Sequence, residues 1–182
     1  KFKSTVPSVQ HVKQDIEVDW IVGAYMLVQA EAVKKSGMFD EDFFMYAEEI
    51  EWCARLRKQG KLVLFSEPTI IHIGGGTSAD YYKTEESENG KNLWNLKGRQ
   101  IMVSNMVRIR KQFGAGWYLF IAGTFLAEIP VFACCLLIDK LINGSGAQFK
   151  WKNLKDYTAN MAVLMKYFFT ILYNKKYFYK VA

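Results

Sequence analysis

Cysteine is scarce in this 182-residue chain, and its placement excludes a disulfide-stabilised scaffold. The three cysteines are Cys53, Cys134 and Cys135, an odd number without spaced pairs. The vicinal pair lies in an apolar run, where a buried cysteine behaves as a small hydrophobic residue. A reducing, cytosolic setting is the simplest interpretation.

Signature motifs of several large function classes are also missing. The sequence contains no helix-turn-helix, zinc-finger or aromatic RNA-binding motif. The run of three glycines at 74–76 lacks the flanking residues of a Walker or Rossmann loop, and the serines show no His-and-acid arrangement for acyl transfer. Nothing near the start resembles a signal peptide, and the first residue is Lys1, so we expect a piece of a longer protein.

Acidic residues are few after position 90, where only Glu128, Asp139 and Asp156 oppose the lysines and arginines. The net charge of +6 indicates an anionic partner. A basic second half beside apolar runs fits an anionic membrane surface better than nucleic acid, which is a remote alternative. Hydrophobic residues make up 51% of the chain, which argues against disorder.

The first ninety residues show alternating strand and helix patterns. Residues 1–17 are polar and indicate a loop, and 79–91 are expected to form an exposed loop. The predicted elements are a buried strand over 19–30, a helix over 31–36 that Gly37 ends, a helix over 47–59, and strands over 61–66 and 69–72.

The second half of the chain is predicted to be helical. Residues 92–113 form a basic amphipathic pattern that Gly114 and Gly116 end. Residues 117–138 are apolar except for Glu128 and are long enough to cross a bilayer. A buried core helix, kinked at Pro130, is the alternative.

A crossing would place Glu128 near the middle of the bilayer, at a cost of about 2–3 kcal/mol if it faces lipid. Two antiparallel helices lying in the interface would avoid that cost. A last helix is predicted over 154–173, and the tail at 173–180 alternates basic and aromatic residues. That tail suits the headgroup region or a solvated terminus.

Three carboxylates, Glu48, Glu49 and Glu51, lie in the first turn of the predicted helix over 47–59. Acids are common there because they complement the helix dipole, which is a purely structural explanation. The functional alternative is that one of them is a general base, whose pKa its neighbours raise and the helix N-terminus lowers. Phe44 and Tyr46 would exclude water and could stack on a sugar face.

His72 follows a predicted strand and precedes the glycine run. It is either a strand-end histidine bonded to the backbone, or a ligand for a metal or a diphosphate beside a loop that lets a ligand approach.

Several short motifs follow one another in a specific order over residues 18–78. They are Gly23-Ala24, Gly37-Met38-Phe39-Asp40-Glu41, Phe43-Phe44-Met45-Tyr46, Glu48-Glu49-Ile50-Glu51-Trp52-Cys53-Ala54-Arg55-Leu56-Arg57, Gly60, Pro68, and His72 with Gly75, Thr77 and Ser78. Together they resemble the second half of the catalytic domain of family 2 glycosyltransferases, especially rhamnosyltransferase-like enzymes of bacterial polysaccharide assembly. The helices after residue 90 fit more loosely.

The resemblance implies roles for particular residues. The family's acidic pair is usually Glu-Asp, and its second member is the catalytic base. Glu49 stands at that position with Glu48 as its partner. The side chain of Glu49 is one methylene longer than that of the usual aspartate. The resemblance assigns His72 to the metal or diphosphate. We expect substrate binding by Gly23, Ala24, Phe44, Tyr46 and Glu51.

The resemblance also implies an α/β fold: a partial GT-A (Rossmann-like) domain over 1–90, then an all-α, membrane-associating region over 91–182. The reaction would be inverting transfer of a sugar from a nucleotide-diphosphate donor to a glycan or lipid-linked acceptor, on the cytoplasmic side of the cell membrane. The nucleotide-binding half, with the main ligands for Mg or Mn, would lie outside this chain, so the piece alone would be inactive. Asp40-Glu41-Asp42 looks like a metal motif but stands in the wrong place. The competing class is a non-catalytic, membrane-associated interaction module.

Overall fold

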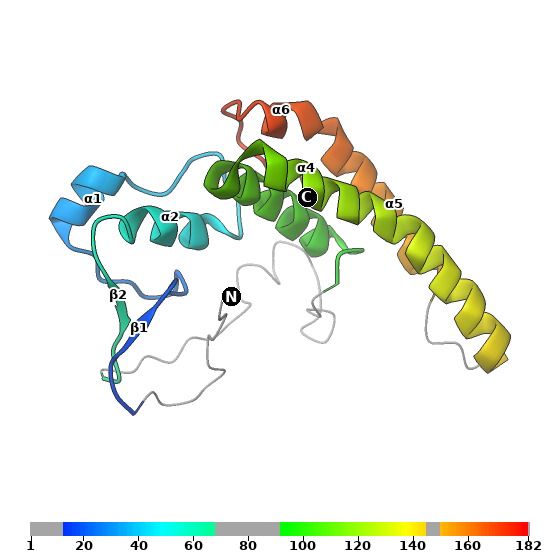
Figure 1. Ribbon diagram of the computed structural model, residues 1–182, viewed down its shortest axis with the longest axis horizontal. Helices are drawn as coiled ribbons and strands as arrows, with labels where there is room; N and C mark the ends of the chain where they lie inside the picture. The colour runs from blue at the N-terminus through cyan, green and yellow to red at the C-terminus, as the bar shows by residue number, and fades with distance from the viewer. Residues whose placement is uncertain (1–12, 68–91, 145–149, 182) are drawn as a thin grey trace.

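The computed structural model describes residues 13–67, 92–144 and 150–181. A small two-stranded sheet and two short helices lie at one end, and three helices make up the rest (Figure 1). The predicted strand over 69–72 and the loop over 79–91 lie outside the described residues. The α/β GT-A fold and the division at residue 90 stay predictions.

Strands β1 (Ile16–Val18) and β2 (Leu62–Leu64) pair antiparallel, with Glu17 opposite Val63. The strand predicted within 61–66 is therefore confirmed. The strand predicted over 19–30 is wrong, since those residues form a turn and extended, mostly exposed chain. The reason is local: the backbone turns at Gly23, and Ile21 N–H donates to Cys53 Sγ rather than to a neighbouring strand.

Helices α1 (Ala30–Ser36) and α2 (Glu48–Leu56) confirm the two short helices that the sequence predicts. Gly37 ends α1 with φ at 75°, a left-handed conformation that favours glycine. Its carbonyl accepts a 2.7 Å hydrogen bond from Trp52 Nε1, so α2 holds the end of α1 in place.

Helix α4 (Leu96–Asn143) contains a sharp break at Gly114, where φ is 87°. The predicted end at Gly114 is therefore confirmed, and the second predicted helix continues directly beyond it. Asn95 caps the start by accepting a hydrogen bond from Gly98 N–H. Residues 96–113 are called the first half of α4 below, and residues 115–143 the second half.

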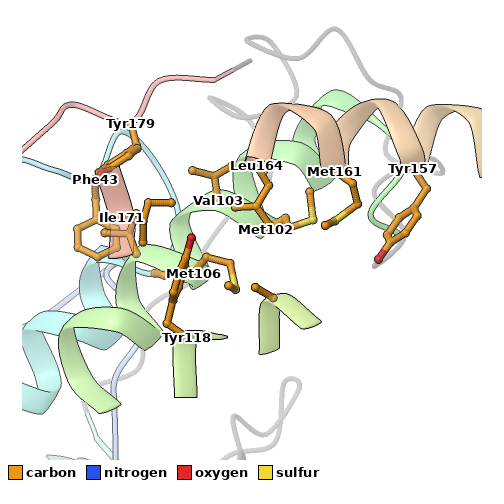
Figure 2. Packing of buried hydrophobic residues seen from close by; sticks show 13 residues of the cluster. Phe43, Met102, Val103, Met106, Tyr118, Tyr157, Met161, Leu164, Ile171 and Tyr179 are labelled. Atoms are coloured by element: carbon orange, nitrogen blue, oxygen red, sulfur yellow. The ribbon is translucent and has the colours of Figure 1, made fainter. Parts of the chain in front are cut away.

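Helices α5 (Trp151–Lys166) and α6 (Phe168–Leu172) confirm the last predicted helix, with a break at Tyr167. Tyr157 bonds Phe125 O while Tyr118 bonds Phe168 O, so α5 runs antiparallel to the second half of α4. The core lies between these helices (Figure 2). Its members include Met102, Val103, Met106, Tyr118, Met161, Leu164 and Ile171.

The C-terminal tail, for which the sequence suggests a headgroup region or a solvated terminus, packs through Tyr179 on Asp42 and Phe43, and its contact with a membrane stays a prediction. Tyr179 is buried and forms a parallel bridge with Phe43, next to which it appears in Figure 2. Asp42 accepts hydrogen bonds from the N–H groups of Tyr177 and Tyr179, through its carboxylate and its carbonyl respectively. Within the tail, residues 173–180, Tyr179 is buried, whereas the other aromatic and basic side chains are exposed.

Candidate active site

A hollow of about 520 Å³ opens at the N-terminus of α2. It is called the hollow below, and it is lined by Gly23, Ala24, Phe39, Asp40, Phe43, Phe44, Tyr46, Glu48 and Glu49. Six of these residues are the ones that the sequence assigns to catalysis or substrate binding. Glu51 does not line the hollow, and His72 lies outside the described residues.

An unusual backbone turn presents the two carboxylates to the hollow. Tyr46 and Ala47 both have φ near 70°, a left-handed conformation that non-glycine residues rarely adopt. Each such residue costs roughly 1–3 kcal/mol, so packing and hydrogen bonds must hold the turn. Ala47 is itself in the core, which provides part of that packing.

Glu49 is the more perturbed of the two carboxylates. Burial raises its pKa above the ordinary value of 4.5, its own backbone N–H partly offsets this, and the charge of Glu48 raises it further. Gly23 packs directly on this side chain, since a Cβ at position 23 would lie 3.4 Å from Glu49 Cβ. A carboxylate with a raised pKa in a hollow is suited to accept a proton near neutral pH.

Glu48 has a carboxylate oxygen without a hydrogen-bond donor in the part of the chain that the structure describes. Its Oε2 atom is buried and accepts no hydrogen bond from the described residues. A buried acceptor without a donor costs about 1–3 kcal/mol. A ligand hydroxyl in the hollow could recover that energy, so the atom is suited to orient a polar substrate.

Glu51 has a structural role that explains why it is not at the hollow. Its carboxylate is buried and accepts hydrogen bonds of 2.8–3.0 Å from Arg55. Arg55 in turn donates to the carbonyls of Ser36 and Met38 at the end of α1. Glu51 therefore joins α1 to α2 through Arg55, and substrate binding by Glu51 stays a prediction.

Asp40 and Asp42 are neutralised by a lysine from α4. Lys111 Nζ lies 2.6 Å from a carboxylate oxygen of each. Burial alone would raise the pKa of Asp40, but the hydrogen bond and charge of Lys111 outweigh it and lower the pKa. Among the described residues no group of three or more His, Cys, Asp or Glu side chains could hold a metal ion.

The first half of α4 also fixes the strained turn. Ser104 Oγ donates to Met45 O at 2.7 Å, directly before Tyr46. Gln100 Nε2 donates to Ser104 Oγ and to Tyr179 O, and Val181 N–H donates to Gln100 Oε1. One buried polar pair on α4 therefore holds both the turn and the tail.

Sequence reasoning missed these supporting residues. Lys111, Ser104 and Gln100 lie within the predicted amphipathic helix over 92–113, and the sequence assigns them no role. A weak signal existed, since Gln100 and Ser104 are spaced i, i+4 on the apolar face, where polar residues need partners.

The chain is similar to the rhamnosyltransferase WbbL of Escherichia coli (strain K12), with 36% identity over 104 residues. No protein-family model and no solved structure matches the chain. The aligned region covers 57% of this chain and 39% of the relative, so the match spans about two fifths of the relative's length. This similarity supports a relationship to glycosyltransferases.

Proposed function

We propose that this chain is the acceptor-side part of an inverting glycosyltransferase of GT-A type, which works in cell-surface polysaccharide synthesis. The observation that carries the proposal is the hollow at the start of α2, because it gathers Glu49, Glu48, two aromatic walls and the Gly23-Ala24 turn. These groups come from separate segments of the sequence. The similarity to a rhamnosyltransferase supports the same class of reaction.

In the proposed reaction Glu49 takes the proton of an acceptor hydroxyl. The hydroxyl oxygen attacks the anomeric carbon of the donor sugar from the face opposite the leaving group. The bond from that carbon to the diphosphate oxygen breaks, and the nucleoside diphosphate leaves with the electron pair. Glu48 would orient the acceptor through its unused oxygen, and Phe44 and Tyr46 would pack on a sugar ring.

A divalent cation, Mg or Mn, would offset the charge of the leaving diphosphate. Of the three acids that line the hollow, Asp40 is paired with Lys111, and we assign Glu48 and Glu49 to the acceptor. We place its main ligands outside this chain and derive no step through it.

A direct assay of donor use tests the proposal. The intact protein is incubated with membranes and with radiolabelled nucleotide-diphosphate sugars, one at a time, and the label in the lipid and polysaccharide fractions is counted. We expect transfer from one or a few donors and release of the matching nucleoside diphosphate. Release of free sugar alone, or no transfer from any donor, would contradict the proposal.

We further propose that the second half of α4 embeds in a membrane surface on the cytoplasmic side. This helix is long and apolar enough to cross a membrane, and only 11% of its most apolar 18-residue window is buried. A core helix would be mostly buried. The far end of α4 extends away from the α2 end (Figure 1), and Leu141 and Ile142 there are 85% and 75% exposed.

Vesicle flotation tests this membrane surface. Changing Leu141 and Ile142 to glutamate should weaken binding to anionic vesicles by at least about tenfold, because each buried leucine or isoleucine contributes roughly 1.5–3 kcal/mol. Leu27→Glu is the matched control, since Leu27 is 82% exposed near the opposite end. Undiminished flotation of the double variant, or an equal loss in the Leu27→Glu control, would contradict membrane binding by the second half of α4.

A further inference from the structure

A second pocket, of about 330 Å³, lies beside the second half of α4 and is called the α4 pocket below. Its lining includes Trp94, Glu128, Val131, Phe132 and Tyr157. None of these residues lines the hollow, and Figure 2 shows Tyr157 and Phe43 at opposite ends of the core cluster. The α4 pocket is therefore separate from the candidate active site.

Glu128 brings a negative charge into an otherwise apolar part of the chain, since it is the one charged residue between Gly114 and Ile138. Its side chain is exposed, and Oε2 accepts a 2.6 Å hydrogen bond from the hydroxyl of Tyr157. None of the ion pairs within residues 13–67, 92–144 and 150–181 includes Glu128. Within those ranges a hydroxyl group holds this carboxylate, and no cation neutralises it.

Aromatic rings line the same pocket. The ring centroids of Trp94 and Phe132 lie 6.2 Å apart, and the ring planes are tilted by 36°. Tyr157 adds a third ring to the lining. The faces of such rings carry negative potential and attract cations. A carboxylate beside aromatic rings suits an ammonium group, which donates N–H bonds to the carboxylate and places its charge against the rings.

The segment that carries Trp94 is fixed in place by α5. Asn160 is buried, and its Nδ2 donates to the carbonyls of Leu93 and Asn95 at 2.7 and 3.0 Å. Gly98 allows the segment to lie close against α4, because a Cβ at position 98 would lie 2.7 Å from Leu93 Cα. These contacts hold Trp94 in position without a ligand, which lowers the entropic cost of binding one.

The α4 pocket lies on the surface that we propose to embed in a membrane. Val131 lines the pocket and is 60% exposed, and Leu126 and Leu137 on the same half of α4 are 43% and 52% exposed. A carboxylate among side chains that contact lipid is costly unless a cation accompanies it. The cations that a membrane surface itself supplies are the ammonium groups of its lipid headgroups.

We propose that the α4 pocket binds the primary ammonium group of a phospholipid headgroup, such as that of phosphatidylethanolamine. Glu128 accepts N–H bonds from this group, and the rings of Trp94 and Tyr157 lie beside its charge. A primary ammonium group has N–H bonds to donate, which a trimethylammonium group lacks. The inference rests on the proposed membrane surface, since the headgroup reaches Glu128 from the membrane in which the second half of α4 embeds.

Flotation of the intact protein with two kinds of vesicle tests this site. Both kinds contain the same fraction of phosphatidylglycerol, and the remainder is either phosphatidylethanolamine or monogalactosyldiacylglycerol, a neutral lipid without an amine. We expect about tenfold tighter binding to the ethanolamine vesicles, the effect of one charged hydrogen bond. Glu128→Gln should abolish this preference. Trp94→Leu should reduce it about threefold, because it removes one ring from beside the cation.

Asp139→Asn and Trp117→Leu are the matched controls. Asp139 and Trp117 lie on the second half of α4, and neither lines the α4 pocket. Each control should keep the preference for ethanolamine vesicles. A general loss of membrane affinity affects both kinds of vesicle equally, so the ratio of the two affinities reports on the pocket alone.

Equal binding of the unaltered protein to both kinds of vesicle would overturn the ammonium site and leave the membrane surface in place. A preference that survives Glu128→Gln, or one that Asp139→Asn also removes, would overturn the site as well. Equally tight binding when phosphatidylcholine replaces phosphatidylethanolamine would contradict the N–H bond to Glu128. Failure to bind either kind of vesicle would remove the membrane surface and the ammonium site together.

Discussion

Replacing Glu49 with glutamine in the intact protein should lower sugar transfer by about 10²- to 10⁴-fold, the usual contribution of a general base. Glutamine keeps the size of the side chain and its contact with Gly23, but it cannot take the hydroxyl proton. Donor binding should stay intact, because we place the main ligands of the cation that holds the donor's diphosphate outside this chain. Initial transfer rates and donor affinity, measured on the same preparation, check both expectations.

Two further variants make this test specific. Glu41→Gln removes an exposed carboxylate from the turn that precedes α2 and should leave the transfer rate unchanged. Glu49→Asp restores the residue that is usual in the resembled family and keeps a carboxylate one methylene further back, so it should retain more activity than glutamine. Near-normal transfer by Glu49→Gln would remove the base assignment.

The pH dependence separates a catalytic Glu49 from a helix-capping one. Transfer needs the ionised carboxylate, so the rate should fall in acid at a pH above the ordinary pKa of 4.5, because burial raises the pKa. A raised pKa in the folded state also means that ionised Glu49 opposes folding at neutral pH. Glu49→Gln should therefore increase the free energy of unfolding at pH 7. That gain should vanish below the unfolded pKa, where both states hold the proton.

A carboxylate that merely complements the dipole of α2 would show the opposite sign. Its replacement by glutamine would remove a favourable charge at the helix N-terminus and lower stability at pH 7. Urea unfolding of the two proteins at neutral and acidic pH therefore decides between the two explanations that the sequence leaves open.

Local patterns in the sequence predicted the elements around Glu49 well. The spacing of acids and apolar residues predicted α2, and Gly37 and Gly114 correctly predicted the end of α1 and the break in α4. These features depend on short-range backbone preferences, which are set by the residue type at each position and its near neighbours. The apolar run over 19–30 suggested a buried strand. In the structure the backbone turns at Gly23, and most residues of the run are exposed.

Contacts between distant segments could not be predicted from one sequence. Nothing near Asp42 indicates that Tyr177 N–H and Lys111 Nζ will bind its carboxylate, since both partners follow much later in the chain. The tail illustrates the same limit, because its alternating pattern gives no sign that the N–H groups of Tyr177 and Tyr179 will bind Asp42.

Replacing Lys111 with methionine should lower the free energy of unfolding by about 3 kcal/mol, because it leaves two mostly buried carboxylates without their shared cation. Lys111 bonds Asp40 and Asp42 at 2.6 Å each. Asp42 also holds the tail, and Asp40 lines the hollow. The loss should therefore also reduce transfer. Urea unfolding and transfer rates measure the two effects.

A rescue variant replaces both Asp40 and Asp42 with asparagine in the Lys111→Met background. Asparagine keeps the side-chain oxygens that accept from the N–H groups of Asp42 and Tyr177, so removing the charges should recover most of the lost stability. Lys34→Met removes an exposed ion pair with Glu31 and should cost only about 0–1 kcal/mol. If the rescue variant is no more stable than Lys111→Met alone, charge neutralisation is not what joins α4 to the hollow, and Lys111 contributes through packing of its stem instead.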